Sequence, residues 1–524
     1  MKILKREKNP KNREIIENSK KQELKSEEKV DLILSKSVKE NLDKFKAFLK
    51  DSTDMVFREF RLGLNGIACA LVYVDGLVDK NLVHETILKP MMYEITTFEG
   101  NRGKAIEPSE AYGFAKDQVI SVADIKEFKT LDECMLMVMS GEVALMIDGF
   151  DTILVLSARG WPSRSITEPQ TEGVVRGPRE GFTETLRFNT ALLRRKCKDP
   201  NMVIKTIRLG RRSKTDVAYI YIKGLTDPEL VEEVAERLNQ IDIDHIVDAG
   251  QIEQLIEDNS MTPFPQVQVT ERPDKTISNI LEGRVAIMVD NSPFALLVPT
   301  SFNQFFQSPE DYNERWIVSS FIRLVRWVAS FLAAFTPAIY IALVSFHPGF
   351  IPTTLALSIA ASRAGVPFPS FFEALLMEIA IELLRESGAR LPKPIGQTIG
   401  IVGGLIIGDA AVRAGVTSPI MVIVVATTAI ASFVVPTYSA SIGLRFIRFP
   451  MMILATALGL YGIMLGFIVI NIHLVSIRSF GASYMAPQSP FIQEDIKDAM
   501  IRAPYRFMKR RPVGSYAIDI DRMD

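Results

Sequence analysis

Acidic residues recur at helical spacing within the apolar C-terminal half of this 524-residue chain. Glu378, Glu382 and Glu386 stand four residues apart and share one face of a helix expected over 371–390, with Glu373 set off from them. Because a carboxylate facing lipid is costly, this face must turn toward water, protein or a pore. Two interpretations stay open: an amphipathic helix at the membrane interface, or a pore lining. In a ring-shaped oligomer each position becomes a ring of carboxylates, an arrangement that selects cations.

The next apolar stretch, 395–412, carries a glycine at every fourth residue. These glycines are Gly396, Gly400, Gly404 and Gly408. The spacing places a groove along one helix face, which allows a neighbouring helix to approach closely. We interpret the groove as a helix-packing surface, and close approach around a pore is its functional variant.

Long uncharged stretches must position these residues. No Asp, Glu, Lys or Arg occurs in 327–362, 414–444 or 449–477. Since a spanning helix needs about 20 mostly apolar residues, the pattern predicts an all-α polytopic membrane domain over 306–480. Its expected spans are 327–346, 395–412, 418–440 and 450–475, with 350–390 re-entrant or amphipathic.

A short basic tail over 481–524 follows the membrane domain. Its cationic residues include Lys497, Arg502, Arg506, Lys509, Arg510 and Arg511. Positive charge beside a span favours the cytoplasmic side. We therefore expect an even number of crossings, although the sequence does not decide which segment fails to span.

The N-terminal half contains an internal repeat. The motif at 141–148, GEVALMID, recurs at 283–290 as GRVAIMVD, and each copy is followed by another apolar strand, which predicts a hairpin. Upstream, 68–76 has a counterpart at 217–224. The repeat predicts two similar α/β subdomains, 30–160 and 201–305, joined by a structured linker over 161–200. Chance similarity between buried strands is the alternative.

Composition excludes several other classes. Net charge is −1, which gives no argument for nucleic-acid binding, and the Lys/Glu-rich residues 1–29 predict a flexible tail. The three scattered cysteines indicate neither a disulfide framework nor a zinc site, so a reducing compartment fits best. No cleavable signal, phosphate loop or HExxH motif occurs, and the histidines are isolated. We expect no enzyme, metal or cofactor, and an N-terminal half on the cytoplasmic side.

Charged and glycine-rich motifs spread along the chain resemble the spore germination protein GerA family. The linker motif carries Arg164, Glu168, Glu172, Arg176, Pro178, Arg179 and Glu180. Segments 189–196, 373–386, 395–404 and 495–504 are similar to that family as well. The resemblance covers 38–512, and the motifs together are specific.

The resemblance implies the A subunit of a germinant receptor in the spore inner membrane. It implies partners, a B-type nutrient-sensing membrane subunit and a C-type lipoprotein subunit, and A subunits assembled as a homo-oligomeric ring that forms a cation channel. The charged N-terminal extension leaves a paralogue similar to SpoVAF open. An ion-coupled secondary transporter and a non-conducting scaffold are the competing functions, and the repeat in the soluble half favours a channel or receptor over a transporter.

Overall fold

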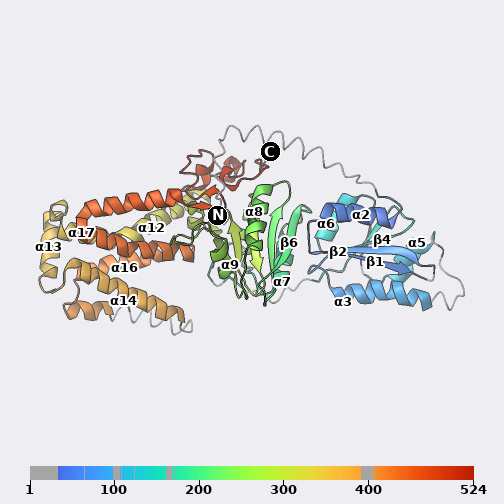
Figure 1. Cartoon of the computed structure of the whole chain (residues 1–524), viewed down its shortest axis with the longest axis horizontal. Helices are drawn as coiled ribbons and strands as arrows, with labels where there is room; N and C mark the ends of the chain where they lie inside the picture. The colour runs from blue at the N-terminus through green and yellow to red at the C-terminus, as the bar shows by residue number, and fades with distance from the viewer. Residues whose placement is uncertain are drawn as a thin grey trace. The chain divides into compact units, whose positions relative to one another are not determined.

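The computed structural model describes residues 34–63, 65–97, 107, 109–122, 124–160, 168–169, 171–390, 404 and 407–523 (Figure 1). The chain divides into two compact units. The first comprises Met1–Glu257, Val267–Pro299 and Lys509–Asp524, and the second comprises Asp258–Gln266 and Thr300–Met508.

The first subdomain is a five-stranded antiparallel sheet between two helical layers (Figure 1). Its order is β1-β2-β4-β5-β3, with β1 Met55–Leu62, β2 Ile67–Val74, β4 Val143–Ile147, β5 Ile153–Leu156 and β3 Ile125–Phe128. Successive side chains of β2 enter different clusters, Leu71 on one face of the sheet and Val72 on the other, as the two-residue period of a strand requires.

Helices cover both faces of this sheet. One face packs against α2 (Val38–Leu49) and α6 (Leu131–Met139). The other face packs against the helical segments α3 (Lys80–Val83), η1 (His84–Leu88), η2 (Pro90–Glu94), α5 (Ala111–Phe114) and η3 (Ala115–Val119).

The second subdomain repeats this arrangement. Its sheet order is β6-β7-β9-β10-β8, with β6 Met202–Leu209, β7 Thr215–Ile222, β9 Val285–Val289, β10 Ala295–Val298 and β8 Gln268–Thr270. The associated helices are α7 (Leu186–Lys196), α8 (Pro228–Asn239), α9 (Ala249–Ile256) and α10 (Pro273–Ile280). The repeated motifs are β4 and β9, each forming an antiparallel hairpin with the next strand. Two similar α/β subdomains are therefore confirmed.

The repeat also includes side-chain hydrogen bonds that hold the opening helix of each copy. Asp148 Oδ1 accepts a hydrogen bond from Val38 N at 3.1 Å, and Asp290 Oδ1 accepts one from Leu186 N at 3.0 Å. Helix α7, which the sequence analysis assigned to the linker, is thus the counterpart of α2 and the first element of the second copy. In the structure the second copy therefore begins at α7, before the expected linker boundary at residue 200. The strand motifs from which that boundary was predicted do not show which helix packs on which sheet.

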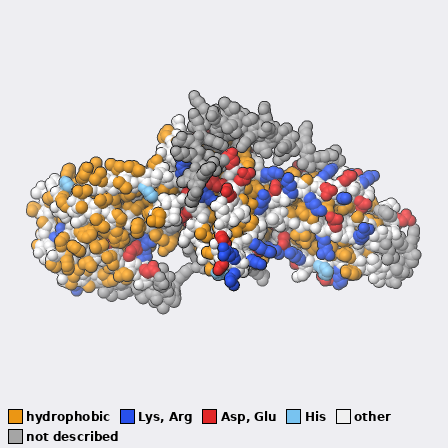
Figure 2. Space-filling model, in the orientation of Figure 1, with side chains coloured by type: hydrophobic (Ala, Val, Ile, Leu, Met, Phe, Trp, Pro, Cys, Tyr) orange, Lys and Arg blue, Asp and Glu red, His pale blue; other side chains and the backbone are white. Residues whose placement is uncertain are grey.

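The second unit is mostly helical. Its principal elements are η4 (Phe302–Phe306), α11 (Glu310–Asn313), α12 (Trp316–Ser345), η5 (Pro348–Phe350), α13 (Thr353–Arg363), α14 (Ser370–Arg390), α16 (Pro419–Phe433) and α17 (Tyr438–Ser476). In Figure 2 hydrophobic side chains cover most of the face shown over α14, α16 and α17. Among the described residues, α12 and α17 are long and apolar enough to cross a membrane, and α16 is a shorter apolar helix. The chain thus combines a two-subdomain soluble part with an apolar helical membrane domain.

Helix α17 is folded back on itself at Gly459. This residue has φ 62° and ψ −140°, which interrupts the helix. A Cβ atom on Gly462 would lie 2.1 Å from the carbonyl oxygen of Leu454, so the two arms pack with their backbones in contact. The span expected over 450–475 is therefore divided between two antiparallel arms. The sequence did not indicate this reversal, because a single glycine in an apolar run does not change the hydropathy pattern.

The other expected spans also differ in detail from the described helices. Span 327–346 corresponds to the last part of α12, which starts 11 residues earlier and ends at Ser345, whereas 418–440 is divided between α16 and the start of α17. The segment 350–390 forms two helices, α13 and α14. Most of 395–412 lies outside the described residues.

The C-terminal segment contains β11 (Arg478–Ser479), β12 (Ala482–Ser483), η6 (Asp495–Asp498), η7 (Tyr505–Phe507) and η8 (Val513–Ser515). Its last residues pack on the second subdomain, where Ile518 N donates a hydrogen bond to Leu225 O at 2.8 Å. Gly283 has φ 91°, and a Cβ atom there would lie 2.8 Å from the Cβ of Ala517. The motif glycine therefore permits both the turn and this close approach.

Candidate functional site

The acidic face of α14 meets arginines of the same chain. Glu378 forms an ion pair with Arg448 on α17, and their side chains are 1% and 2% exposed. Arg448 Nε also donates a hydrogen bond to the carbonyl oxygen of Ala333 on α12, at 2.9 Å. Two charged side chains thus connect three helices inside an apolar bundle, where a carboxylate without a partner would be strongly unfavourable.

A second pair lies one turn further along α14. Arg445 Nη1 donates to both carboxylate oxygens of Glu382, at 2.7 and 2.8 Å. Arg385 also approaches Glu382 at 3.6 Å and donates to Ser432 Oγ at 2.9 Å. Its guanidinium lies 4.6 Å from the ring centroid of Phe433, a cation–π arrangement. This carboxylate is therefore held between helices α14, α16 and α17.

Glu373 occupies the first turn of α14 and is fully buried. Its Oε1 accepts hydrogen bonds from Ser418 N at 2.5 Å and from Thr417 Oγ1 at 3.1 Å, and its Oε2 lies 3.4 Å from Arg363 Nε. Ser418 is the N-cap of α16, so the carboxylate meets the positive end of that helix dipole. Glu373 thereby joins α13, α14 and α16.

The other candidates expected from the sequence, Glu386 and the four glycines, do not belong to these ion pairs between helices. Glu386 is exposed, and Gly404 has no atom within 4 Å of a built Cβ, whereas a Cβ on Gly408 would lie 3.5 Å from Val422 of α16. Gly396 and Gly400 lie outside the described residues. The structure thus brings Glu373, Glu378 and Glu382 together with cations, but does not gather all four acids.

Sequence reasoning overlooked the arginines that complete these pairs, Arg363, Arg385, Arg445 and Arg448. A usable signal was present, because Arg445 and Arg448 separate two long uncharged runs and stand three residues apart. Charges inside apolar helices pair with one another, so an acidic face on one helix and a basic face on another predict contact.

The linker motif is attached to the second subdomain through Glu172. Lys275 Nζ lies 2.6 Å from Glu172 Oε1, and Thr270 donates to the other carboxylate oxygen. Burial raises the pKa of Glu172, but Lys275, the hydrogen bonds and Arg272 outweigh it and leave that pKa below its ordinary value. Arg272 Nη2 also donates to the carbonyl oxygen of Pro178 at 2.7 Å. These residues fix the path of the linker.

Other linker residues lie nearer the surface. Glu180 forms ion pairs with Arg195 and Lys196 of α7, whereas Glu168 and Arg179 form an exposed pair at 3.3 Å. Arg176 is exposed, and Arg164 lies outside the described residues. Glu172, Pro178 and Glu180 therefore contact elements of the second subdomain, and Glu168 pairs with Arg179.

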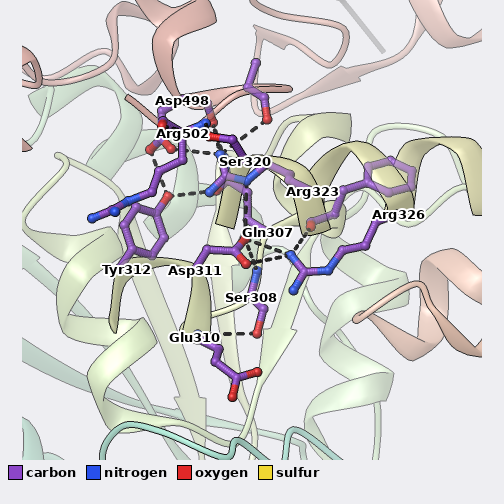
Figure 3. A network of polar contacts seen from close by, with 12 residues as sticks. Gln307, Ser308, Glu310, Asp311, Tyr312, Ser320, Arg323, Arg326, Asp498 and Arg502 are labelled. Carbon is purple, nitrogen blue, oxygen red and sulfur yellow. Dashed lines mark hydrogen bonds and ion pairs between the residues drawn. The ribbon is translucent and has the colours of Figure 1, made fainter. Parts of the chain in front are cut away.

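A second buried ionic cluster, which we call the base cluster, joins α11, the start of α12 and the C-terminal segment (Figure 3). Asp311 is 2% exposed and lies between Arg323 at 3.2 Å and Arg326 at 2.7 Å. Arg323 Nη1 also lies 2.9 Å from Asp498 Oδ1. These residues are not among the site candidates expected from the sequence. In the described part of the chain no cluster of three or more His, Cys, Asp or Glu residues is arranged to hold a metal.

Comparison with known proteins decides the family. A profile described as "Bacillus/Clostridium GerA spore germination protein" matches residues 43–513. The chain belongs to the GerA family. Within it, spore germination protein B1 of Bacillus subtilis is 43% identical over 479 residues, with 91% of this chain and 97% of that protein covered.

Further GerA-family relatives match over similar lengths. Spore germination protein KA of Bacillus subtilis is 42% identical, with 92% of this chain and 87% of that protein covered. The crystal structure of the N-terminal domain of the A subunit of the Bacillus megaterium spore germinant receptor GerK3 is also similar. It shows 32% identity and a TM-score of 0.41, and it covers 52% of this chain and 97% of that chain.

Proposed function

We propose that this chain is the A subunit of a spore germinant receptor and forms, as a ring of copies in the spore inner membrane, a nutrient-gated cation channel. Membership of the GerA family supports the receptor assignment. The observation that carries the channel proposal is the row of carboxylates along α14, at Glu373, Glu378 and Glu382, inside an apolar helical unit. Buried ionisable groups in membrane helices mark ion pathways.

In this proposal the ion pairs hold the closed state. Arg448 and Arg445 neutralise Glu378 and Glu382, so the pathway offers no free negative charge to a cation. A nutrient signal from a B-type subunit, with a C-type lipoprotein as the third partner, displaces α14 relative to α17. The separated carboxylates then face the aqueous path and attract monovalent cations.

The proposed topology places the N-terminal half and the C-terminal tail on the same side, facing the spore core. Its support lies within the helical unit, where Ser320 near the start of α12 and Arg502 after the last helix exchange two hydrogen bonds at 3.0 and 3.2 Å. Helices that begin and end at one side of a bilayer cross it an even number of times.

Planar-bilayer recording of the purified full chain tests the channel. We expect unitary cation currents from spontaneous openings of the chain alone, with Glu382→Gln reducing the preference for cations over anions, because one carboxylate is lost from the path. Glu386→Gln is the matched control, since it removes an exposed acid from the same helix. Currents with the same selectivity in both variants would remove Glu382 from the pathway, whereas saturable slow flux would indicate a transporter.

A non-conducting scaffold is the second candidate. It is favoured by the intrachain pairing of Glu373, Glu378 and Glu382, since paired carboxylates also serve to orient helices. Silent bilayers, together with normal cation release from spores carrying Glu382→Gln, would support the scaffold over the channel.

A further inference from the structure

Large apolar side chains are exposed on two neighbouring pieces of the helical unit. The first two turns of α12 expose Ile317 (63%) and Phe321 (66%), and the C-terminal segment exposes Met500 (42%), Ile501 (58%) and Phe507 (66%). A large contiguous patch of exposed apolar side chains marks a site of interaction with a protein or a membrane.

Polar contacts hold the C-terminal segment beside α12. The apolar side chains named above are therefore exposed on a segment whose backbone is held in place. Ser320 Oγ donates to Arg502 O at 3.0 Å and accepts from Arg502 N at 3.2 Å (Figure 3). Phe321 follows Ser320 directly in the sequence, and Ile501 directly precedes Arg502. The fully buried Arg323 donates to the carbonyl oxygens of Asp498 and Ala499 at 2.8 and 3.3 Å.

Aromatic contacts extend this attachment toward Phe507. The guanidinium of Arg502 lies 4.6 Å from the ring centroid of Tyr505, and Tyr505 Oη donates to Tyr312 O at 3.3 Å. Together with the base cluster, these contacts hold the backbone over 498–505, which carries the exposed side chains of Met500 and Ile501.

The length of α12 indicates the depth of this surface. Its 30 residues correspond to about 45 Å, close to the full bilayer thickness including headgroups. The uncharged stretch beginning at Trp327 is long enough to fill the hydrocarbon core. Ser320 lies seven residues before it, about 10 Å along the axis, and is therefore at headgroup level. Trp316, at the start of the helix, is a residue typical of that interface.

The charges beside the apolar side chains complement anionic lipid. Lys497 and Arg506 are exposed, no acidic residue occurs between Met500 and Phe507, and Asp498 is paired with Arg323. A segment with basic and apolar side chains at the interface combines electrostatic attraction to phosphate with partial insertion of the apolar groups.

We infer that residues 497–507 form a membrane-surface contact that binds anionic phospholipid headgroups. Met500, Ile501 and Phe507 lie at the boundary between headgroups and acyl chains, and Lys497 and Arg506 contact lipid phosphates. This contact is independent of ion conduction and holds for a channel, a transporter or a scaffold.

Cysteine labelling of the full chain in nanodiscs tests the contact. The three native cysteines are buried, and burial raises the pKa of the Cys69 thiol to about 12, so an introduced cysteine reacts selectively. A bimane label on Phe507→Cys should be quenched at least twofold more by lipids carrying a nitroxide near the headgroup than a label on Leu255→Cys. Leu255 is the matched control because it is half-exposed on α9.

Lipid composition separates the anionic contact from simple burial. Quenching of the Phe507→Cys label should be stronger in nanodiscs containing phosphatidylglycerol than in phosphatidylcholine alone, and Lys497→Glu/Arg506→Glu should abolish that difference. Two outcomes would overturn the inference. In one, aqueous iodide quenches the label as strongly as it does at Leu255→Cys. In the other, only a second, nitroxide-labelled copy of the protein quenches it, which would identify a protein–protein contact instead.

Discussion

Glu378 on α14 and Arg448 on α17 form an ion pair with side chains 1% and 2% exposed, 70 residues apart in the sequence. Desolvation makes such a pair expensive, yet removal of one member costs more than the pair itself contributes. The relationship therefore makes the packing of α14 against α17 sensitive to either charge.

Loss of one partner should destabilise the helical unit strongly. Glu378→Gln leaves Arg448 buried without a counter-charge, with an expected cost of about 3–5 kcal/mol. The double variant Glu378→Leu/Arg448→Leu should be more stable than Glu378→Gln. Denaturant unfolding of the detergent-solubilised full chain measures both, with Glu386→Gln as the surface control. A Glu378→Gln protein as stable as that control would show that the pair contributes nothing to folding.

The reversal at Gly459 should not tolerate a side chain. Gly459→Ala places a Cβ about 2.8 Å from His347 Cε1 at a positive φ, and strain of this kind costs about 1–3 kcal/mol. We expect a lower melting temperature and less correctly folded protein in the membrane fraction. Gly365→Ala is the control, because a Cβ there meets nothing within 4 Å. Equal melting temperatures would contradict the hairpin.

Ionisation of Glu253 should make the stability of the second subdomain depend on pH. Burial, with Glu257 and Asp248 nearby, raises the pKa of Glu253 to about 7. The folded state binds this proton more tightly than the unfolded state does. The protonated side chain therefore contributes its full share to the free energy of unfolding below about pH 4, and this contribution is lost as the pH rises through about 7. Glu253→Gln should therefore stabilise the protein by about 1–2 kcal/mol at pH 8.

Unfolding at pH 4 and pH 8 checks the sign of this effect. At pH 4 the parent and the Glu253→Gln variant should be within about 0.5 kcal/mol, since both side chains are then neutral. A variant that is less stable than the parent at pH 8 would show that the ionised carboxylate is favourable in the fold.

The two motif aspartates should have equivalent roles. Asp290→Ala removes the acceptor for Leu186 N, and Asp148→Ala removes the acceptor for Val38 N. Losing such a helix-terminal hydrogen bond costs about 1 kcal/mol. Hydrogen exchange should increase in α7 for the first variant and in α2 for the second. Faster exchange in the opposite helix would contradict the equivalence.

The duplicated soluble half could be predicted from the sequence alone, because each hairpin lies within a short segment and its buried strands are visible directly as apolar runs. It also indicated the apolar helical domain and the family, since both depend on composition and motifs read along the chain. Even the helix over 371–390 and its shared acidic face followed from local spacing, as α14 shows.

The residues that those acids contact could be identified only from the folded arrangement of the helices. Arg448 and Arg445 lie 70 and 63 residues from their partners, and spacing within one helix carries no information about which other helix packs against it. The reversal at Gly459 and the attachment of Arg502 beside Ser320 were likewise decided by packing. The physical reason is that burial makes an unpaired charge or polar group costly, and the fold, not the local sequence, determines which partner removes that cost.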